Sequence, residues 1–441
     1  MNSSLIDALV RIVGRQWVRH RRADLATYAM DGLPTHESVP GLVIMPGSPA
    51  EVREIVRLLH LVQVPFVARG AGTGLSGGAL AESDAVLITL TRMNRILRVD
   101  PIQRRAVVQP GVVNARLSEA VAPLGLHYVP DPSSQAACTV GGNVAENAGG
   151  PHCLKYGVTT NHIVSLEVVL PDGSALRLGS DQGEAWGPDL VGLFVGSEGM
   201  FGIATEITVR LEQIPESVRT MLADFTTVRA ASEAVSAIIA AGIVPAALEM
   251  MDKACVAAVE ASIYAAGYPT DAAAVLLVEL DGQADAVGAE AHTVKDILLE
   301  CGAREVRSAS TAVDRGRLWQ GRKKAFGAMG RIAPDLAVQD AVVPRSALPA
   351  IMDRIEAIRQ HHDLTISNVF HAGDGNLHPN ISFDRRDPVV SARVQLACRE
   401  IMAACVAAGG SITGEHGVGS DKLDYMPWIF DAQTLGAMRA V

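Results

Sequence analysis

The pattern of apolar and polar positions divides the chain into two parts, and the texture changes after Pro215. In the first part, short apolar runs bounded by glycine, proline or asparagine predict strands. These runs cover residues 64–68, 86–90, 96–100, 104–109, 163–170, 175–178 and 204–211. Apolar residues at helical spacing predict helices over residues 48–61 and 113–122, and residues 1–30 are expected to be helical with a basic side.

The second part mixes longer helical patterns with strands. Strands are predicted at residues 221–225, 246–250, 275–280, 336–343, 364–370 and 377–383, and helices at 227–241, 284–300, 346–360 and 388–408. This β-α-β-β-α-β-like order predicts an antiparallel sheet with helices on one face. We therefore expect an α+β protein with one domain over residues 1–214 and a second over 215–400. Residues 401–441 are expected to return to the first domain.

Composition narrows the function. A chain of 441 residues with 49% apolar and 20% charged residues is a folded globular protein, and a net charge of −10 argues against nucleic acid as a partner. No apolar run is long enough to span a membrane, and no secretion signal is evident. The six cysteines form no C-x-x-C pair, which favours a reducing, cytoplasmic location and argues against an iron–sulfur cluster in this chain.

Three glycine-rich stretches carry the first functional hypothesis. Arg69–Gly78 holds five glycines directly after a predicted strand, and backbone amides exposed by glycine can form a nest for phosphate. A flexible surface loop explains this stretch alone equally well. Residues 128–151 form a second long, small and polar stretch, and residues 195–203 a third. Because long loops in compact domains are usually functional, ligand contact is favoured over a plain surface loop for the second stretch.

A histidine pair carries the second hypothesis. Asp374-Gly375 favours a type I′ two-residue turn, which would pair His371 directly with His378 and bring their Cβ atoms to roughly 4.5–5.5 Å. Asn380 would follow on the same face. Two imidazoles at that spacing can share a divalent metal, although a pair that is only hydrogen-bonded on a sheet surface is the alternative.

A further metal ligand is available near the end of the chain. Glu415 and His416 lie between glycines in the stretch Gly409–Gly419. Glu415 is a candidate carboxylate ligand, and His416 beside it is a candidate base. Two histidines and one carboxylate would leave open positions for a chelating substrate, so a metal site is favoured over the structural alternative.

Taken together, these segments resemble the vanillyl-alcohol-oxidase-type flavoproteins, in the branch that holds D-lactate dehydrogenase, D-2-hydroxyglutarate dehydrogenase and the flavin subunit of glycolate oxidase. The resemblance covers nearly the whole chain. Its motifs are Arg69–Gly78, Pro130–Ser134, Gly141–Gly150, Lys155–Gly157, Gly196–Gly199, His371–His378 and Gly414–Gly419. The stretch from Gly321 to Asp335 is most similar to the glycolate oxidase flavin subunit.

The resemblance implies FAD, bound by a two-subdomain domain of the PCMH type and followed by a substrate (cap) domain. Residues 70–76 would hold the pyrophosphate, and segments 130–147 and 197–203 would line the flavin and adenosine. The implied cofactor contacts are Arg69, Gly70, Ala71, Gly72, Thr73, Gly74, Leu75, Ser76, Pro130, Asp131, Ser134, Gly141, Gly142, Asn147, Glu198, Gly202 and Ile203. No histidine or cysteine occurs within Arg69–Gly78, so the FAD is expected to be non-covalent.

The resemblance also implies oxidation of a 2-hydroxy acid to the 2-oxo acid. A divalent metal, with zinc, manganese and iron as candidates, would be held by His371, His378 and Glu415 and would bind the substrate. His416 would take the hydroxyl proton while a hydride passes to the flavin. Arg322 would clamp the carboxylate, and Asn380 would also contact the substrate. The alternative for Arg322 is a surface arginine in a basic run.

Two departures from the family pattern narrow the substrate. The 2-hydroxyglutarate enzymes carry a threonine and a lysine where this chain has Phe326 and Val338. A distal carboxylate would lose its partners here, so a small substrate such as glycolate or D-lactate is favoured. The family's usual closing segment with Asp-Pro and Asn-Pro-Gly-Lys is not found before Val441, which puts full activity in question.

Three rival functions stay open at this point. They are a D-2-hydroxyglutarate-type dehydrogenase, a nicotinamide dehydrogenase, and a flavoprotein-like subunit without chemistry. The nicotinamide enzyme is disfavoured, because the glycine loop is followed by no clear helix and by no acidic residue at the ribose spacing. Electrons must leave the flavin, and an iron–sulfur electron-transfer subunit or a quinone is the expected acceptor. Peripheral association with the inner face of the membrane is compatible with the sequence.

Overall fold

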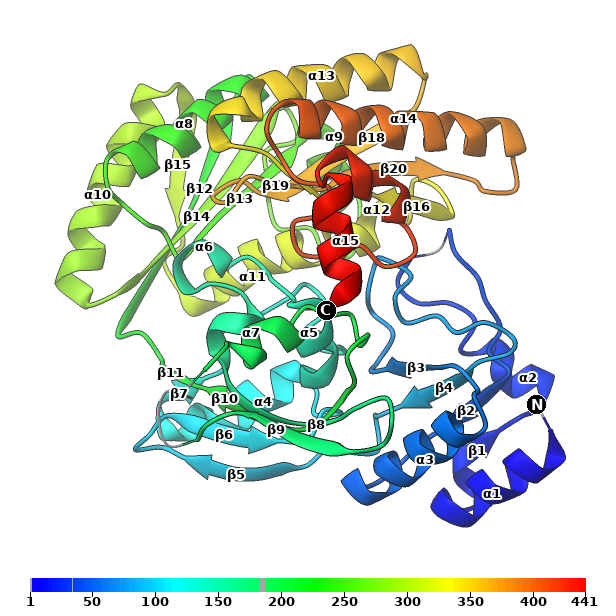
Figure 1. The fold of residues 1–441 in the computed structure, drawn as a ribbon. Helices are drawn as coiled ribbons and strands as arrows, with labels where there is room; N and C mark the ends of the chain where they lie inside the picture. Colours follow the sequence, from blue (N-terminus) through cyan, green and yellow to red (C-terminus); the bar gives the residue numbers. More distant parts are fainter. Residues whose placement is uncertain (1, 34, 182–186) are drawn as a thin grey trace. The chain divides into compact units, whose positions relative to one another are not determined.

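The computed structural model describes residues 2–33, 35–181 and 187–441, and the chain folds into two compact units (Figure 1). Unit 1 comprises residues 1–150, 157–214 and 415–421. Unit 2 comprises residues 151–156, 215–414 and 422–441. The chain therefore passes from one unit to the other five times, and neither unit is one continuous stretch.

The first sheet of unit 1 is small and partly parallel. Its strand order is β1 (Val18–Arg19), β2 (Leu42–Ile44), β4 (Val86–Thr89) and β3 (Phe66–Arg69), with β2 and β3 parallel to β4. Helices α1 (Ser3–Val13) and α3 (Pro49–Leu61) share its core. The hydroxyl of Ser48 accepts from the Glu51 amide and Pro49 opens α3, as the Ser-Pro-x-Glu pattern predicts.

The second sheet of unit 1 is antiparallel. Its order is β5 (Ile96–Asp100), β6 (Arg105–Val108), β10 (Ile203–Arg210), β8 (Ile163–Val169) and β9 (Ala175–Gly179). Around its core lie α4 (Asn114–Val121), α5 (Val140–Glu146) and α7 (Leu190–Phe194). The short strands β7 (Leu126–His127) and β11 (Glu212–Gln213) pair with each other. Short helices at η2 (Ala122–Leu124) and η3 (Thr159–His162) complete the unit.

Two expectations for unit 1 are wrong in detail. Residues 1–30 are not one helical region: Gly14, at a φ of 87°, ends α1, and the chain continues through η1 (Arg15–Trp17), β1 and α2 (Arg22–Ala26). The second glycine-rich stretch is not a loop throughout. It contains helix α5, whose first turn is capped by the Thr139 hydroxyl accepting from the Gly142 amide.

Unit 2 is built on a large antiparallel sheet. The order is β15 (Ala303–Ser308), β12 (Ser217–Phe225), β14 (Ala274–Gly282), β13 (Ala247–Asp252), β18 (Thr365–His371), β19 (Asn376–Leu377) and β17 (Ala341–Val342). Strand β20 (Pro379–Phe383) pairs with both β18 and β16 (Asp335–Val338). The α+β class with an antiparallel sheet is therefore confirmed.

Helices cover this sheet in two groups. Helices α8 (Val228–Ala240) and α10 (Ala284–Glu300) pack on β12 and β14, and α13 (Leu348–His361) packs on α8 and on α14 (Pro388–Ala407). The second group, α9 (Lys253–Glu260), α11 (Ala312–Lys323) and α12 (Ala325–Met329), shares a separate core with Leu222, Met251 and Leu277. The smaller elements are α6 (Cys153–Tyr156), η4 (Arg345–Ala347), η5 (Leu423–Trp428) and α15 (Ala432–Ala440).

Two predicted strands of unit 2 are interrupted in the structure. The run 336–343 divides into β16 and β17 around Gln339 and Asp340, and the run 377–383 divides into β19 and β20 at His378. Pro379 has no amide hydrogen to donate to a ladder, so it suits the start of a strand rather than its middle. Both breaks fall where candidate functional residues lie. No helix in the described part of the chain is long and apolar enough to cross a membrane.

Candidate functional site

The glycine loop of unit 1 follows β3 and lies against the start of α5. A Cβ on Gly70 would come within 2.3 Å of the Thr139 hydroxyl oxygen, so only glycine permits this approach. Gly72 has a φ of 70°, in the left-handed region that side chains disfavour. The structure therefore brings the first and second glycine-rich stretches together.

A cavity of about 340 Å³ opens beside this contact within unit 1. Its walls are formed by residues that are uncharged except for Arg116. They are Ala71, Thr91, Asn94, Ile96, Gly111, Val112, Val113, Arg116, Ala137 and Thr139. A Cβ added to Gly74 would meet no atom within 4 Å, so space is available on the loop itself. This largely uncharged cavity fits a flat dinucleotide better than a compact charged ligand.

Two of the charged or polar side chains predicted to touch the cofactor have partners in unit 1. The Arg69 guanidinium donates to the carbonyls of Met30 (2.7 Å), Ala79 (3.3 Å) and Tyr28 (3.4 Å). Asn147 ends α5 at a φ of 49°, and its side-chain oxygen accepts from the Thr160 amide. Their side chains thus hold the loops in place, and direct cofactor contact stays a prediction for both.

Glu198 has a similar structural task. Its two carboxylate oxygens accept from the amides of Val418 and Gly419, each at 2.7 Å. Ile203, another predicted cofactor residue on this segment, belongs to the core shared by α1, α3 and the first sheet. Gly202 packs so close to the Val169 carbonyl that a Cβ would lie 2.5 Å from it.

The remaining predicted contacts come from the loop and the 130–150 region. The Pro130 carbonyl accepts from Asn114, whose amide also donates to Asn143. A Cβ on Gly150 would lie 2.7 Å from the Asp131 carbonyl. The structure thus packs residues 130–131 beside the end of the second glycine-rich stretch, with Ser134, Gly141 and Gly142 on the same segment. Thr73, Leu75 and Ser76 continue the loop of residues 70–78, and the Ser76 carbonyl accepts from the Asp421 amide.

The predicted register of the histidine hairpin is wrong. His371 pairs with Asn376, not with His378, and the loop between them has four residues, 372–375. A type I′ turn needs a positive φ at both central residues, but only Gly375 has one. The Asp374 carboxylate instead accepts from the Asn376 amide at 3.2 Å, which closes a wider turn.

The two histidines nevertheless lie together in unit 2. Their ring centroids are 5.3 Å apart, and the rings are nearly perpendicular. His371 Nδ1 lies 2.8 Å from a Glu249 oxygen, and His378 Nδ1 lies 3.4 Å from the Gln339 carbonyl and 3.9 Å from Asp340. Because each Nδ1 faces an acceptor, a metal would be bound through Nε2 of both rings. This donor set fits a divalent transition metal.

Glu249 joins His371 to Arg322. The second Glu249 oxygen lies 2.6 Å from Arg322 Nη2, and both side chains are almost fully buried. Among the described residues, the guanidinium nitrogens of Arg322 have no partner in hydrogen-bond geometry. Buried polar groups in proteins are rarely left so, and an arginine fork matches a carboxylate. The alternative of a surface arginine is therefore excluded, and Arg322 has unused capacity to bind an anion.

Asn380 and Phe326 lie beside the same pair of rings. Asn380 is fully buried and donates to the His378 carbonyl at 2.6 Å, whereas its side-chain oxygen has no hydrogen-bond partner among the described residues. The Phe326 ring packs edge-on against His378, with centroids 6.4 Å apart. The site thus combines a polar acceptor with an apolar wall.

Asp340 holds both ends of the loop that carries Glu415 and His416. Its buried carboxylate accepts from the Thr413 hydroxyl at 2.6 Å, and from the Gly414 amide and the Lys422 ammonium at 3.0 Å each. Glu415 follows Gly414 directly in the chain. The loop therefore begins next to a residue that is hydrogen-bonded to Asp340, and the Asp340 carboxylate lies 3.9 Å from His378 Nδ1.

Glu249, Asp340 and Lys422 are not among the residues predicted from the sequence. A signal was present for both acids. Glu249 interrupts the apolar run 246–251, and Asp340 interrupts the run 336–343. A charged residue inside an apolar strand is rarely buried without a partner, so such a residue marks a buried ion pair or a site.

Family models match both parts of the chain. Residues 40–179 match the FAD binding domain, and residues 214–441 match the C-terminal domain of FAD linked oxidases. Among curated proteins, glycolate oxidase subunit GlcD of Escherichia coli K12 is 48% identical over 439 residues, covering 100% of this chain and 88% of that protein. D-lactate dehydrogenase of Anaerostipes hadrus is 32% identical, covering 91% of this chain and 85% of that protein.

Solved structures share the fold at low sequence identity. p-Cresol methylhydroxylase with bound substrate has a TM-score of 0.82 at 17% identity, with 99% of this chain and 92% of the other covered. The 4-ethylphenol oxidase of Gulosibacter chungangensis in an isoeugenol complex has a TM-score of 0.81 at 20% identity, with 99% and 93% covered. These structures establish the architecture alone.

Proposed function

Because this chain belongs to the FAD-linked oxidases and is an FAD-dependent oxidoreductase, we propose that it oxidises a small 2-hydroxy acid, such as glycolate or D-lactate, to the 2-oxo acid. Two relatives are named for glycolate and D-lactate. The observation that carries the proposal is Arg322, a buried guanidinium with unused hydrogen-bonding capacity whose partner Glu249 also contacts His371.

The cofactor contacts are proposed to be those implied by the family resemblance. Residues 70–76, together with Gly141 and Gly142, would hold the pyrophosphate of FAD through backbone amides. We propose that the FAD is non-covalent. Cys138 supports this, because burial raises the pKa of its thiol, and a neutral thiol is a poor nucleophile. FAD, when bound, supplies the acceptor for a hydride from the substrate.

His371, His378 and Glu415 are proposed to hold a divalent metal, with zinc, manganese and iron as candidates. When bound, such a metal supplies Lewis-acid stabilisation of the substrate's hydroxyl oxygen. The buried histidine pair with its Nδ1 atoms already facing acceptors supports this assignment. The chain is arranged to fix the two rings before any metal arrives.

The chain's own residues then position and deprotonate the substrate. Arg322 would bind the carboxylate through two parallel N–H donors, which fixes the orientation of the hydroxyl-bearing carbon. His416 would accept the hydroxyl proton on its imidazole. Asn380 would contact the substrate through its side-chain oxygen, which accepts hydrogen bonds.

Glu249 is proposed as a positioning residue in this scheme. One carboxylate oxygen faces His371 Nδ1 and the other faces Arg322. The same side chain therefore sets the ring that would ligate the metal and the guanidinium that would clamp the carboxylate. Its negative charge also compensates the positive charge of Arg322 when no substrate anion is bound, because an uncompensated buried charge is costly.

The apolar residues favour a small substrate. Phe326 packs on His378, and the buried Val338 pairs across the ladder with Asn380. Neither side chain can pair with a second carboxylate of a larger hydroxy acid. Electrons are proposed to leave the flavin for a separate subunit, with an iron–sulfur protein as the candidate. One relative is named as a subunit of glycolate oxidase, and this sequence has no C-x-x-C pair.

The test is anaerobic flavin reduction with a panel of 2-hydroxy acids. Purified protein should be yellow, and glycolate or D-lactate should bleach it. Bleaching should be slowed strongly in His416→Ala and Arg322→Lys variants that retain FAD. A yellow protein that no 2-hydroxy acid bleaches contradicts the proposed substrate class. Bleaching by 2-hydroxyglutarate alone contradicts the small-substrate assignment.

A further inference from the structure

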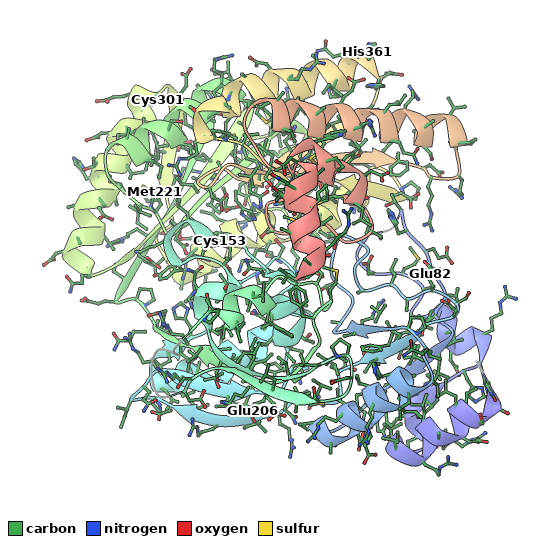
Figure 2. The ribbon with its side chains drawn as sticks, in the orientation of Figure 1. Glu82, Cys153, Glu206, Met221, Cys301 and His361 are labelled. Carbon is green, nitrogen blue, oxygen red and sulfur yellow. The ribbon has the colours of Figure 1, made fainter. Side chains whose placement is uncertain are left out.

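The C-terminal end of α13 and the middle of α14 bring a second group of metal-ligating side chains together within unit 2. His361 is the last residue of α13, His362 follows it as the C-cap, and Glu400 lies on α14. One ligand atom from each of the three lies within 4.8 Å of the other two. Figure 2 labels His361 at the outer end of α13.

We propose that His361, His362 and Glu400 form a surface site for a divalent transition metal, Zn²⁺ being the simplest fit. Two imidazoles and one carboxylate are a common ligand set for this ion, and solvent can complete a tetrahedral sphere. The site is separate from the pair formed by His371 of β18 and His378, which lies between β19 and β20, and it does not depend on the proposed oxidase chemistry.

The distances fit with small movements. In a tetrahedral zinc site with bonds of about 2.0–2.1 Å, ligand atoms lie about 3.4 Å apart. His362 Nε2 and a Glu400 oxygen are already 3.0 Å apart, so a metal replaces the proton between them after an opening of about 0.4 Å. His361 and Glu400 are exposed and half-exposed, so both can rotate to close the remaining distance.

The fold fixes the least mobile ligand. His362 is 8% exposed, and its backbone amide donates to the Ile358 carbonyl at the end of α13. Its own carbonyl accepts from Arg393 of α14 at 3.0 Å. The His361 and His362 rings lie edge to face, with centroids 4.8 Å apart. The negative end of the α13 dipole also favours a cation at this position.

Equilibrium dialysis of the FAD-loaded protein against Zn²⁺ tests the site. Compared with the wild type, His361→Ala and Glu400→Gln should each bind one Zn²⁺ ion fewer, or bind that ion at least about 100-fold more weakly, since even outer-shell changes cost about 10–100-fold. His292→Ala is the matched control, because His292 is an exposed helical histidine beside a single carboxylate, Asp296. It should bind as many ions as the wild type.

Thermal unfolding gives a second measurement, because a metal that joins α13 to α14 stabilises the folded state. Added Zn²⁺ should raise the unfolding temperature of His292→Ala as much as that of the wild type, and should raise that of His361→Ala less. Equal zinc stoichiometry and affinity in the wild type, His361→Ala and Glu400→Gln would overturn the proposal. Binding to the wild type only at millimolar Zn²⁺ would overturn it as well.

Discussion

Helix α11 carries two arginines, two turns apart, that face the same side of the unit 2 sheet. The two differ in how many hydrogen bonds their guanidinium groups donate. At one end, Arg315 donates twice to Glu279 of β14, at 2.9 and 2.7 Å. At the other end, Arg322 lies 2.6 Å from Glu249 of the neighbouring strand β13. Glu279 and Glu249 are both buried, and Leu277, two residues from Glu279, pairs directly with Glu249.

Glu279 is saturated with hydrogen-bond donors. Besides Arg315 it accepts from Trp319 Nε1 at 2.6 Å and from the Thr220 hydroxyl, and His152 lies 3.4 Å away. Burial alone would raise the pKa of Glu279, but the hydrogen bonds from His152 and Arg315 and the charge of Arg315 outweigh it and hold that pKa far below its usual range. This pair attaches α11 to the sheet and has no capacity left for a ligand.

The pair at the Arg322 end of α11 is not saturated with hydrogen bonds. The Arg322–Glu249 contact is an ion pair without hydrogen-bond geometry, and it is more deeply buried than the Arg315–Glu279 pair. Fully satisfied buried networks stabilise a fold, whereas a buried donor without acceptors is destabilising unless something binds there. Two arginines of one helix thus form similar pairs with buried acids, but one pair is a structural attachment and the other is part of a candidate binding site.

The largest predicted effect is on catalysis. Arg322→Lys keeps the charge but removes the bidentate fork, so kcat/KM for the bleaching 2-hydroxy acid should fall about 100-fold, as expected when one hydrogen bond to a charged group, worth about 1.5–3 kcal/mol, is lost. Stopped-flow flavin reduction measures it. Arg315→Lys is the matched control and should leave kcat/KM close to the wild-type value. If both variants lose activity equally, the two ends of α11 do not differ as argued.

The second prediction separates the two acids. Glu249→Gln should weaken metal binding at the histidine pair by about 10–100-fold, because the acceptor of a metal-ligating histidine tunes its basicity and orientation. Glu279 contacts neither His371 nor His378, so the Glu279→Gln variant should bind metal as the wild type does. Metal content after dialysis against graded chelator concentrations reports the difference. Equal affinities in both variants would remove the positioning role of Glu249.

The third prediction concerns acid stability. The folded-state pKa of Glu279 lies below its unfolded value of about 4.3, so its stabilisation is present above that pH and is lost as the pH falls towards the folded-state pKa. Glu279→Gln should lower the free energy of unfolding at pH 7 by about 1.5–3 kcal/mol and should flatten its decline below about pH 4.5. Urea unfolding across pH measures both. An unchanged pH dependence would show that Glu279 does not carry the effect.

The smallest predicted effect is on specificity. Phe326→Thr, combined with Val338→Lys, should raise kcat/KM for 2-hydroxyglutarate relative to glycolate by about tenfold, because a positive group would then be available for the distal carboxylate. Phe326→Leu is the apolar control and should not shift the ratio. A ratio that stays constant in the double variant would show that these two positions do not select substrate size.

Much of the fold follows from local pattern. The helix at α10 and the strand β5 have the predicted bounds, because a long apolar stripe and a short apolar run need no distant information. The hairpin register at His371 does not follow locally. Asp-Gly favours a two-residue turn, but β18 pairs with β20 through Ser367 and Asn380, and this longer ladder fixes the register two residues away from the turn preference.

The same division holds for the candidate sites. His371, His378, Arg322 and the glycine loop are visible as short motifs, since their chemistry is carried by adjacent residues. Glu249 lies 122 positions from His371, and Asp340 lies 74 positions from Gly414. No spacing rule links such residues, because only the antiparallel pairing of distant strands and loops brings them together.

The loop of residues 415–421, whose two ends are bound by Asp340, also affects when unit 1 can finish folding during synthesis. Glu198 lies in unit 1, yet one of its partners, the Gly419 amide, comes 221 residues later in the chain. At about 5–20 residues per second, the ribosome needs roughly 10–45 seconds to make that distance. Unit 1 therefore waits, with the half-buried Glu198 carboxylate still short of its amides, until almost the whole of unit 2 has emerged.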